Sequence, residues 1–219
     1  MDELPSNRRP LSTRDTRWAK FLAAALARGR VAPNVISVAS VVVAAFGAVA
    51  LVCVPEVGAA WQRAALYICT AAMIQLRLGC NLIDGMVAVE GGLGTKTGAV
   101  FNDLPDRIAD VFLIAGAGYA AREIPHAIEL GWLATSLALI TAYVRVLGTS
   151  VGAGTSFLGP MAKQHRMACL TIACVVAAAL SRGEWHARVI VAALLVISIG
   201  SVLTIARRVQ RILGTLEAS

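Results

Sequence analysis

Long uninterrupted runs of apolar residues dominate the chain. No charged residue lies between Arg30 and Glu56, and none lies between Arg188 and Arg207. Each run holds about the 20 residues that a helix needs to cross the hydrocarbon core of a bilayer. Four further apolar stretches are long enough to span if charges near one end are accepted: residues 62–90, 97–121, 125–148 and 162–181. The pattern predicts an all-α integral membrane protein with six transmembrane helices.

A shorter segment with helical periodicity precedes the first apolar run. Between Arg14 and Arg30, basic residues occupy one part of the helical wheel and apolar residues another, the latter being Trp18, Phe21, Leu22, Ala25 and Leu26. This pattern is typical of an amphipathic helix that lies in the membrane interface. Pro33 then suits the first turn of the first span. We therefore expect an N-terminal segment (1–30), a six-helix transmembrane domain (31–208) and a C-terminal tail (209–219).

The composition supports a lipid environment. Of the 219 residues, 58% are hydrophobic and only 15% are charged, well outside the usage of soluble domains. A soluble protein with so apolar a core would need amphipathic covering sequence, which a chain this short does not contain. The first span is too long for a signal peptide and follows thirty polar and basic residues, so we expect it to remain in the mature protein.

The surplus of positive charge, a formal +7, lies at the edges of the membrane segments. Three basic residues follow the last span and seven precede the first: Arg8, Arg9, Arg14, Arg17, Lys20, Arg28 and Arg30. By the positive-inside rule both termini are cytoplasmic, which requires an even number of spans. Basic residues placed there attract anionic lipid headgroups, so we expect membrane lipids and not nucleic acid as partners.

Charged residues gather in four of the spans at the ends that this topology places on the cytoplasmic side. They are Asp84, Glu90, Asp103, Asp106, Arg107, Asp110, Arg145, Lys163, His165 and Arg166. Charges at membrane depth usually face an internal cavity and mark a function. Three aspartates within eight residues cannot snorkel to the interface, because their side chains are short. The sequence therefore predicts one polar cavity that opens to the cytoplasm.

The spacing of these residues indicates a metal site. At about 100° per residue, Asn102, Asp106 and Asp110 share one face of a helix, and Asn81 and Asp84 share a face of the preceding one. Facing oxygen ligands suit Mg²⁺ or Mn²⁺, which commonly neutralise phosphate or pyrophosphate. A cation-coupled transporter would use the same acidic residues. It would avoid the nearby basic set, Arg145, Lys163 and Arg166, which is typical of phosphate binding.

Two segments carry a recognisable motif. Residues 81–88 read Asn-Leu-Ile-Asp-Gly-Met-Val-Ala, and residues 98–106 read Gly-Ala-Val-Phe-Asn-Asp-Leu-Pro-Asp. They resemble the signature of the CDP-alcohol phosphotransferase family, Asp-x-x-Asp-Gly-x-x-Ala-Arg followed by Gly-x-x-x-Asp-x-x-x-Asp. Residues 33–37, Pro-Asn-Val-Ile-Ser, also resemble the element that opens the family's first span. With the six spans and the lead-in helix, the resemblance covers nearly the whole chain.

Three signature positions differ. Asn81 and Asn102 replace the first and third aspartates, and Val89 replaces the arginine. Asparagine keeps a carbonyl oxygen for a metal but removes the charge. Either fewer ions bind, or Asp103 and Glu90 supply what is missing.

The register and the role of Asp103 admit alternatives. Using Asp106 and Asp110 as the last acidic pair would place Asn102 at a glycine position, so the register that starts at Gly98 is preferred. Asp103 has a second interpretation as the cap of a helix start, with Pro105 close behind it.

The resemblance implies that an alcohol hydroxyl attacks the phosphorus of a CDP-linked lipid such as CDP-diacylglycerol, with release of CMP. In this scheme Asp106 is the catalytic base. The other implied roles are metal binding by Asn81, Asp84, Asn102, Asp106 and Asp103, CDP binding by Pro33, Asn34, Ser37, Asn81, Gly85, Ala88 and Gly98, and acceptor binding by Arg145, Lys163 and Arg166. A homodimer in a bacterial inner membrane, with its active site facing the cytoplasm, is also expected. The alternatives are an inactive CDP-lipid-binding relative and a transporter.

Overall fold

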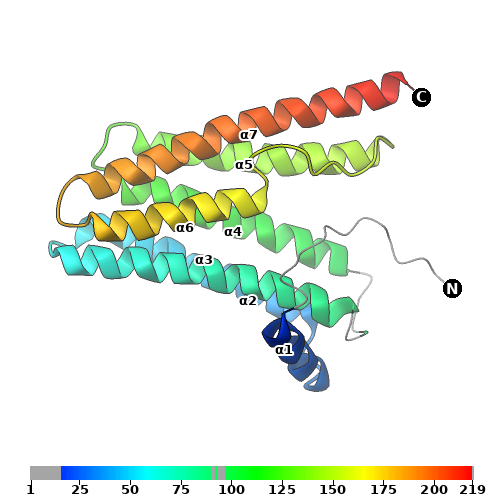
Figure 1. Ribbon diagram of the computed structural model, residues 1–219, viewed down its shortest axis with the longest axis horizontal. Helices are drawn as coiled ribbons and strands as arrows, with labels where there is room; N and C mark the ends of the chain where they lie inside the picture. The colour runs from blue at the N-terminus through cyan, green and yellow to red at the C-terminus, as the bar shows by residue number, and fades with distance from the viewer. Residues whose placement is uncertain (1–15, 90–91, 93–96, 219) are drawn as a thin grey trace.

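A computed structural model describes residues 16–89, 92 and 97–218, so predictions for residues 1–15 and Glu90 lie outside the described residues. The elements are α1 (Arg17–Arg28), α2 (Pro33–Cys53), the short 3₁₀ helix η2 (Val54–Glu56), α3 (Ala60–Val89), α4 (Gly98–Ala120), α5 (Ala127–Ser150), α6 (Lys163–Ala179) and α7 (Trp185–Glu217). Six long helices run side by side in one bundle, and α1 lies across one end of it (Figure 1). The predicted all-helical fold is confirmed, with no strand among the described residues.

Four helices are long enough and apolar enough to cross a bilayer: α2 with η2, α3, α5 and α7. The other two members of the bundle fall outside this group for visible reasons. Helix α4 carries four charged residues between Asp103 and Asp110, and α6 has only 17 residues. The predicted number of six spans therefore stays a prediction, although both helices pack within the same bundle.

Helix α1 packs against the end of α3 through one apolar face. Ala19 and Ala23 are buried in a cluster that also contains Met86 and Val87 of α3. Trp18 and Phe21 are 51% and 70% exposed, which is unfavourable in water but suits a helix at a lipid surface. Its location in the interface stays a prediction.

Close packing of small residues joins α4 to α5. A Cβ atom added at Gly118 would lie 2.8 Å from the Ala127 carbonyl oxygen and 3.0 Å from the Gly131 Cα atom. Only glycine lets the two backbones approach this closely, a common device where helices associate in lipid. The contact lies at the end of the bundle opposite to the charged ends of these helices.

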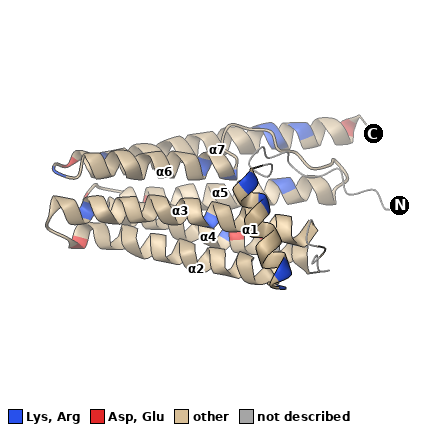
Figure 2. Cartoon of the chain, turned by 60° about the horizontal axis from the view of Figure 1, so that its bottom comes forward, with Lys and Arg blue, Asp and Glu red and all other residues tan. Residues whose placement is uncertain are grey.

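The charged side chains are concentrated toward one end of the bundle. Figure 2 shows most of the blue and red segments near α1, the C-terminus and the middle of the helices, with few at the far end. Arg122, just after the end of α4, and Glu56, at the end of η2, form an ion pair at 2.5 Å. Helix α7 was expected to leave the membrane near residue 207, and the helix itself continues to Glu217.

Candidate functional site

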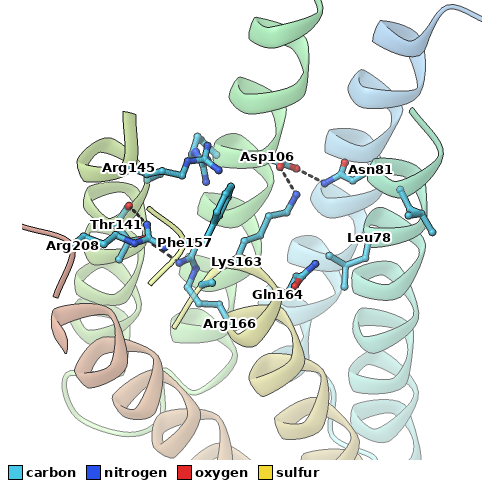
Figure 3. A pocket seen from close by; sticks show the side chains of 14 residues that line it. Leu78, Asn81, Asp106, Thr141, Arg145, Phe157, Lys163, Gln164, Arg166 and Arg208 are labelled. Carbon is cyan, nitrogen blue, oxygen red and sulfur yellow. Dashed lines mark hydrogen bonds and ion pairs between the residues drawn. The ribbon is translucent and has the colours of Figure 1, made fainter. Parts of the chain in front are cut away.

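A cavity of about 240 Å³ lies among α3, α4, α5, α6 and α7. Five basic residues and one acidic residue are among those that line it: Arg107, Arg145, Lys163, Arg166, Arg208 and Asp106. Figure 3 shows that most of these side chains converge from different helices. Such an excess of positive charge in a concave site suits an anionic ligand.

Asp106 of α4 lies at the centre of the polar contacts. The Asn81 amide of α3 donates a hydrogen bond to Asp106 Oδ1, and the Lys163 ammonium at the start of α6 donates to Oδ2 (Figure 3). Arg77 lies 3.5 Å from the same Oδ1 atom. Three helices thus meet at one carboxylate, and both of its oxygens are engaged.

The register between α3 and α4 follows from helical spacing. Arg77 and Asn81 are four residues apart on α3, and Asp106 and Asp110 are four residues apart on α4. Residues at this spacing share a face, so the two pairs lie opposite each other, Asn81 with Asp106 and Arg77 with Asp110. The predicted facing oxygen ligands stay a prediction, because at Asn81 the amide NH₂ group faces Asp106.

A closed ion cluster lies one helical turn beyond Asp106. Asp110 accepts hydrogen bonds of 2.8 Å from Arg77 through Oδ1 and of 2.8 Å from Arg166 through Oδ2. Arg166 also donates to the Thr141 hydroxyl and to the Met161 carbonyl oxygen. All three charged residues are at most 2% exposed. Arg166, expected to bind the acceptor, is therefore largely committed to this cluster.

Asp84 of α3 pairs with Ser37 of α2. The Ser37 hydroxyl donates to Asp84 Oδ2 at 2.6 Å, and both residues are buried. Asp84 Oδ1 is buried without a hydrogen-bond partner. A buried carboxylate oxygen left unpaired is unfavourable, and a bound cation would satisfy it.

The other residues expected to bind the CDP group occupy the same end of the bundle. Pro33 begins α2, Gly85 and Ala88 lie in the last turns of α3, and Gly98 begins α4. The Asn34 amide is 3.5 Å from the hydroxyl of Thr97, which directly precedes α4. Asn102 lies within α4, and its side chain is outside the described residues.

Asp103 lies apart from Asp84 and Asp106 in its contacts. It accepts hydrogen bonds from Arg107 at 2.6 Å and from Arg145 at 2.5 Å, in a partly exposed position. Its alternative interpretation as a helix cap is wrong, because α4 begins five residues earlier at Gly98. Arg145, predicted to bind the acceptor, does line the cavity.

Arg208 of α7 is a cavity residue that the sequence reasoning assigned only to the membrane edge. Its Nε donates to the Leu158 carbonyl at 2.9 Å, and its NH1 donates to the Thr141 carbonyl at 2.6 Å. A signal existed in the spacing, because Ser201, Thr204 and Arg208 are three and four residues apart and so share one face of α7. All three are buried.

The described residues offer few ligands for a divalent ion. Among the described residues, no three Asp, Glu, His or Cys side chains lie close enough together to hold a metal ion. Asp84, with its unpaired buried oxygen, is the carboxylate best suited to a cation. Mg²⁺ is often held by one or two carboxylates together with the phosphates of its substrate.

Comparison of sequences alone identifies no relative. Neither the models of known protein families nor any curated protein sequence matches this chain.

Comparison of structures gives a clear result. The phosphatidylinositol phosphate synthase of Mycobacterium tuberculosis, with CDP-DAG bound, superposes with a TM-score of 0.73 and 18% identity, over 90% of this chain and 94% of that one. Its complex with manganese and citrate superposes with a TM-score of 0.68 and 20% identity, over 89% of this chain and 88% of that one. Its apo form superposes with a TM-score of 0.67 and 18% identity, over 87% of this chain and 94% of that one. This chain therefore shares the fold of the M. tuberculosis phosphatidylinositol phosphate synthase.

Proposed function

We propose that this protein is a membrane-embedded CDP-alcohol phosphotransferase that moves a phosphatidyl group from a CDP-linked lipid to an alcohol acceptor. One observation carries the proposal. The two signature segments, matched in spacing, meet at Asn81 and Asp106 beside a basic cavity. They do so in a fold whose solved neighbour has been seen with CDP-DAG and with manganese.

The donor end of the site is formed by α2, α3 and the start of α4. Asp84 would hold Mg²⁺ or Mn²⁺, with amide oxygens of Asn81 and Asn102 as candidate neutral ligands. When bound, the ion would neutralise the pyrophosphate of the donor. Gly85, Ala88 and Gly98 are small residues at this end, and they leave room for the nucleotide.

The acceptor end is the basic cavity. Arg145 and Lys163 are 29% and 23% exposed in their side chains, so both can reach a ligand there. Each is now paired with a carboxylate, and an incoming phosphate would compete for the same N–H donors. We infer that the acceptor alcohol carries a phosphate or another anionic group.

In the proposed transfer one bond forms at phosphorus, one breaks, and one proton moves to the protein. The acceptor oxygen forms a bond to the phosphorus next to the lipid moiety, and the bond from that phosphorus to CMP breaks. The proton of the attacking hydroxyl passes to Asp106, which lines the cavity. A positioned base of this kind contributes about a hundredfold or more to such reactions.

The test is turnover by purified protein in nanodiscs that contain CDP-diacylglycerol. Inositol phosphate and glycerol phosphate would be compared with inositol, glycerol and serine, and CMP and the lipid products would be measured by mass spectrometry. We expect CMP and a new phospholipid with a phosphorylated acceptor, loss of both in excess chelator, and recovery with Mg²⁺ or Mn²⁺. Full activity in chelator would contradict the metal-dependent reaction.

A second candidate is a CDP-lipid-binding protein without catalysis. It is favoured by the contacts of Asp106, whose oxygens are both engaged by Asn81 and Lys163, and by the loss of two signature carboxylates. Saturable binding of CDP-diacylglycerol without CMP release from any acceptor would select this candidate.

We further propose that the cavity faces the cytoplasm and that the protein forms a homodimer. In a variant without native cysteines, Pro5→Cys and Thr215→Cys should resist an impermeant thiol reagent in intact cells. Gly183→Cys, in the turn between α6 and α7, should react and serves as the control. Labelling at residue 5 or 215 would refute the topology. Light scattering of the purified protein measures the oligomeric state.

A further inference from the structure

Asp106 is surrounded by fixed positive charge in a way that the family signature does not require. Its Oδ2 contacts the Lys163 ammonium, and its Oδ1 lies 3.5 Å from the Arg77 guanidinium. Four aspartates at the signature positions would carry four negative charges, enough for two divalent ions. Here only Asp84 and Asp106 remain, because Asn81 and Asn102 are neutral.

We propose that Lys163 takes the place of one divalent ion as a covalently attached cation, so that this site holds a single ion, on Asp84. The proposal rests on the proposed function, because it assigns the charges of that same site. Lys163 reaches Asp106 from a different helix, α6, and its side chain is 23% exposed while that of Asp106 is 13% exposed. A pair so shielded from water neutralises its carboxylate effectively.

The orientation of Asn81 supports a single ion. An amide has one oxygen, which can bind a metal, and one NH₂ group, which cannot. Asn81 directs its NH₂ group at Asp106. Asn81 therefore acts toward Asp106 as a hydrogen-bond donor, and no pair of ligand oxygens is presented between them.

Asp84 has a carboxylate oxygen without a hydrogen-bond partner, whereas both oxygens of Asp106 are engaged. The Oδ2 atom of Asp84 accepts a hydrogen bond from the neutral Ser37 hydroxyl, and its Oδ1 is buried without a hydrogen-bond partner. One carboxylate is a sparse site for Mg²⁺ or Mn²⁺ unless phosphates complete the coordination. The single ion should accordingly be counted with the CDP-linked donor present.

The test counts Mn²⁺ ions bound per chain in nanodiscs containing CDP-diacylglycerol and no acceptor. Free Mn²⁺ is measured by electron paramagnetic resonance, and protein-free nanodiscs of the same lipid give the background. The decisive variant, Asn81→Asp/Lys163→Met, restores a carboxylate opposite Asp106 and removes the attached cation. Its matched control, Asn81→Asp/Lys20→Met, restores the carboxylate but removes an exposed lysine of α1.

We expect one Mn²⁺ per chain for the natural sequence, one for the Lys20 control and two for the Lys163 variant. Two ions or none in the natural sequence would overturn the proposal, as would two ions in the control. One ion in a Lys163 variant that elutes as a folded protein would overturn it too. If that variant does not fold, the first two counts still decide.

The result is separable from the proposed function, because ion counting needs no turnover. CMP release by a chain that binds two ions would refute the inference and keep the function. One ion per chain without CMP release from any acceptor would keep the inference and select the binding-only candidate.

Discussion

Two aspartates one helical turn apart on α4 differ in almost every physical respect. Asp110 is 1% exposed, is paired with two arginines at 2.8 Å, and is absent from the residues that line the cavity. Asp106 lines the cavity and is held by one lysine and one amide. The comparison separates a carboxylate that holds helices together from one that can meet a substrate.

The closed cluster of Arg77, Asp110 and Arg166 stabilises the fold only when all three members are present. Burying an ion costs several kcal/mol, which the other ions and hydrogen bonds offset. Removal of one member leaves the others buried and uncompensated. The open site has a different balance, because its partners lie at a cavity wall and a ligand can replace them.

The largest effect is expected for Asp110→Asn. It leaves Arg166 buried without its counterion and leaves Arg77 with only the 3.5 Å contact to Asp106, so the free energy of unfolding should fall by about 3–5 kcal/mol. Equilibrium unfolding in mixed micelles with increasing SDS measures this change. The control is Glu129→Gln, an exposed carboxylate beside His126 on α5, which should change stability by less than about 0.5 kcal/mol. Equal effects of the two substitutions would break the comparison.

Asp106→Asn should act on turnover and not on folding. We expect the rate of CMP release to fall by at least about a hundredfold, the usual contribution of a positioned base, while CDP-diacylglycerol still binds. Release and binding are measured in the same preparation. Unchanged turnover would contradict the catalytic role of Asp106, and with it the contrast between Asp106 and the structural carboxylate Asp110.

Arg145→Met should weaken acceptor binding. Loss of one charge-assisted hydrogen bond to a phosphate corresponds to about 1.5–3 kcal/mol, so KM for a phosphorylated acceptor should rise about tenfold or more. The KM for CDP-diacylglycerol should stay the same, which serves as the internal control. A rise in both values would place Arg145 at the donor end instead.

The smallest effect is expected for Asp103→Asn. Its two ion pairs are partly exposed, and such pairs contribute about 1 kcal/mol or less. Turnover should stay within a few-fold of the natural rate. A loss comparable to that of Asp106→Asn would move the base to Asp103 and change the alignment of α4 with the signature.

Hydropathy and motif spacing could predict the helices and the register of the site. The expected stretch 62–90 is observed as Ala60–Val89, and 97–121 as Gly98–Ala120, because long apolar runs leave little choice of structure. The pairing of Asn81 with Asp106 follows from the same periodicity, since both lie on the faces that the signature defines.

The partners of each charge could not be predicted in the same way. The pairing of Arg77 with Asp110 depends on how far α3 and α4 overlap along their axes. Arg208 depends on α7 packing beside α5, where it reaches the Thr141 carbonyl. Contacts between distant segments are set by packing, and a single sequence carries no direct record of them.

The length of α7 has a kinetic consequence for the proposed reaction. Arg208 lies 23 residues after Trp185, about 35 Å along the helix axis, which exceeds the roughly 30 Å thickness of a hydrocarbon core. In the proposed topology, with Trp185 at the opposite face of the membrane, the cavity that Arg208 lines would lie at the water boundary. In the proposed reaction the donor would then reach the cavity by lateral diffusion within the bilayer, and the acceptor would arrive from bulk water. The rate should accordingly depend on the donor's mole fraction in the lipid, at constant bulk concentration, and on the acceptor's concentration in solution.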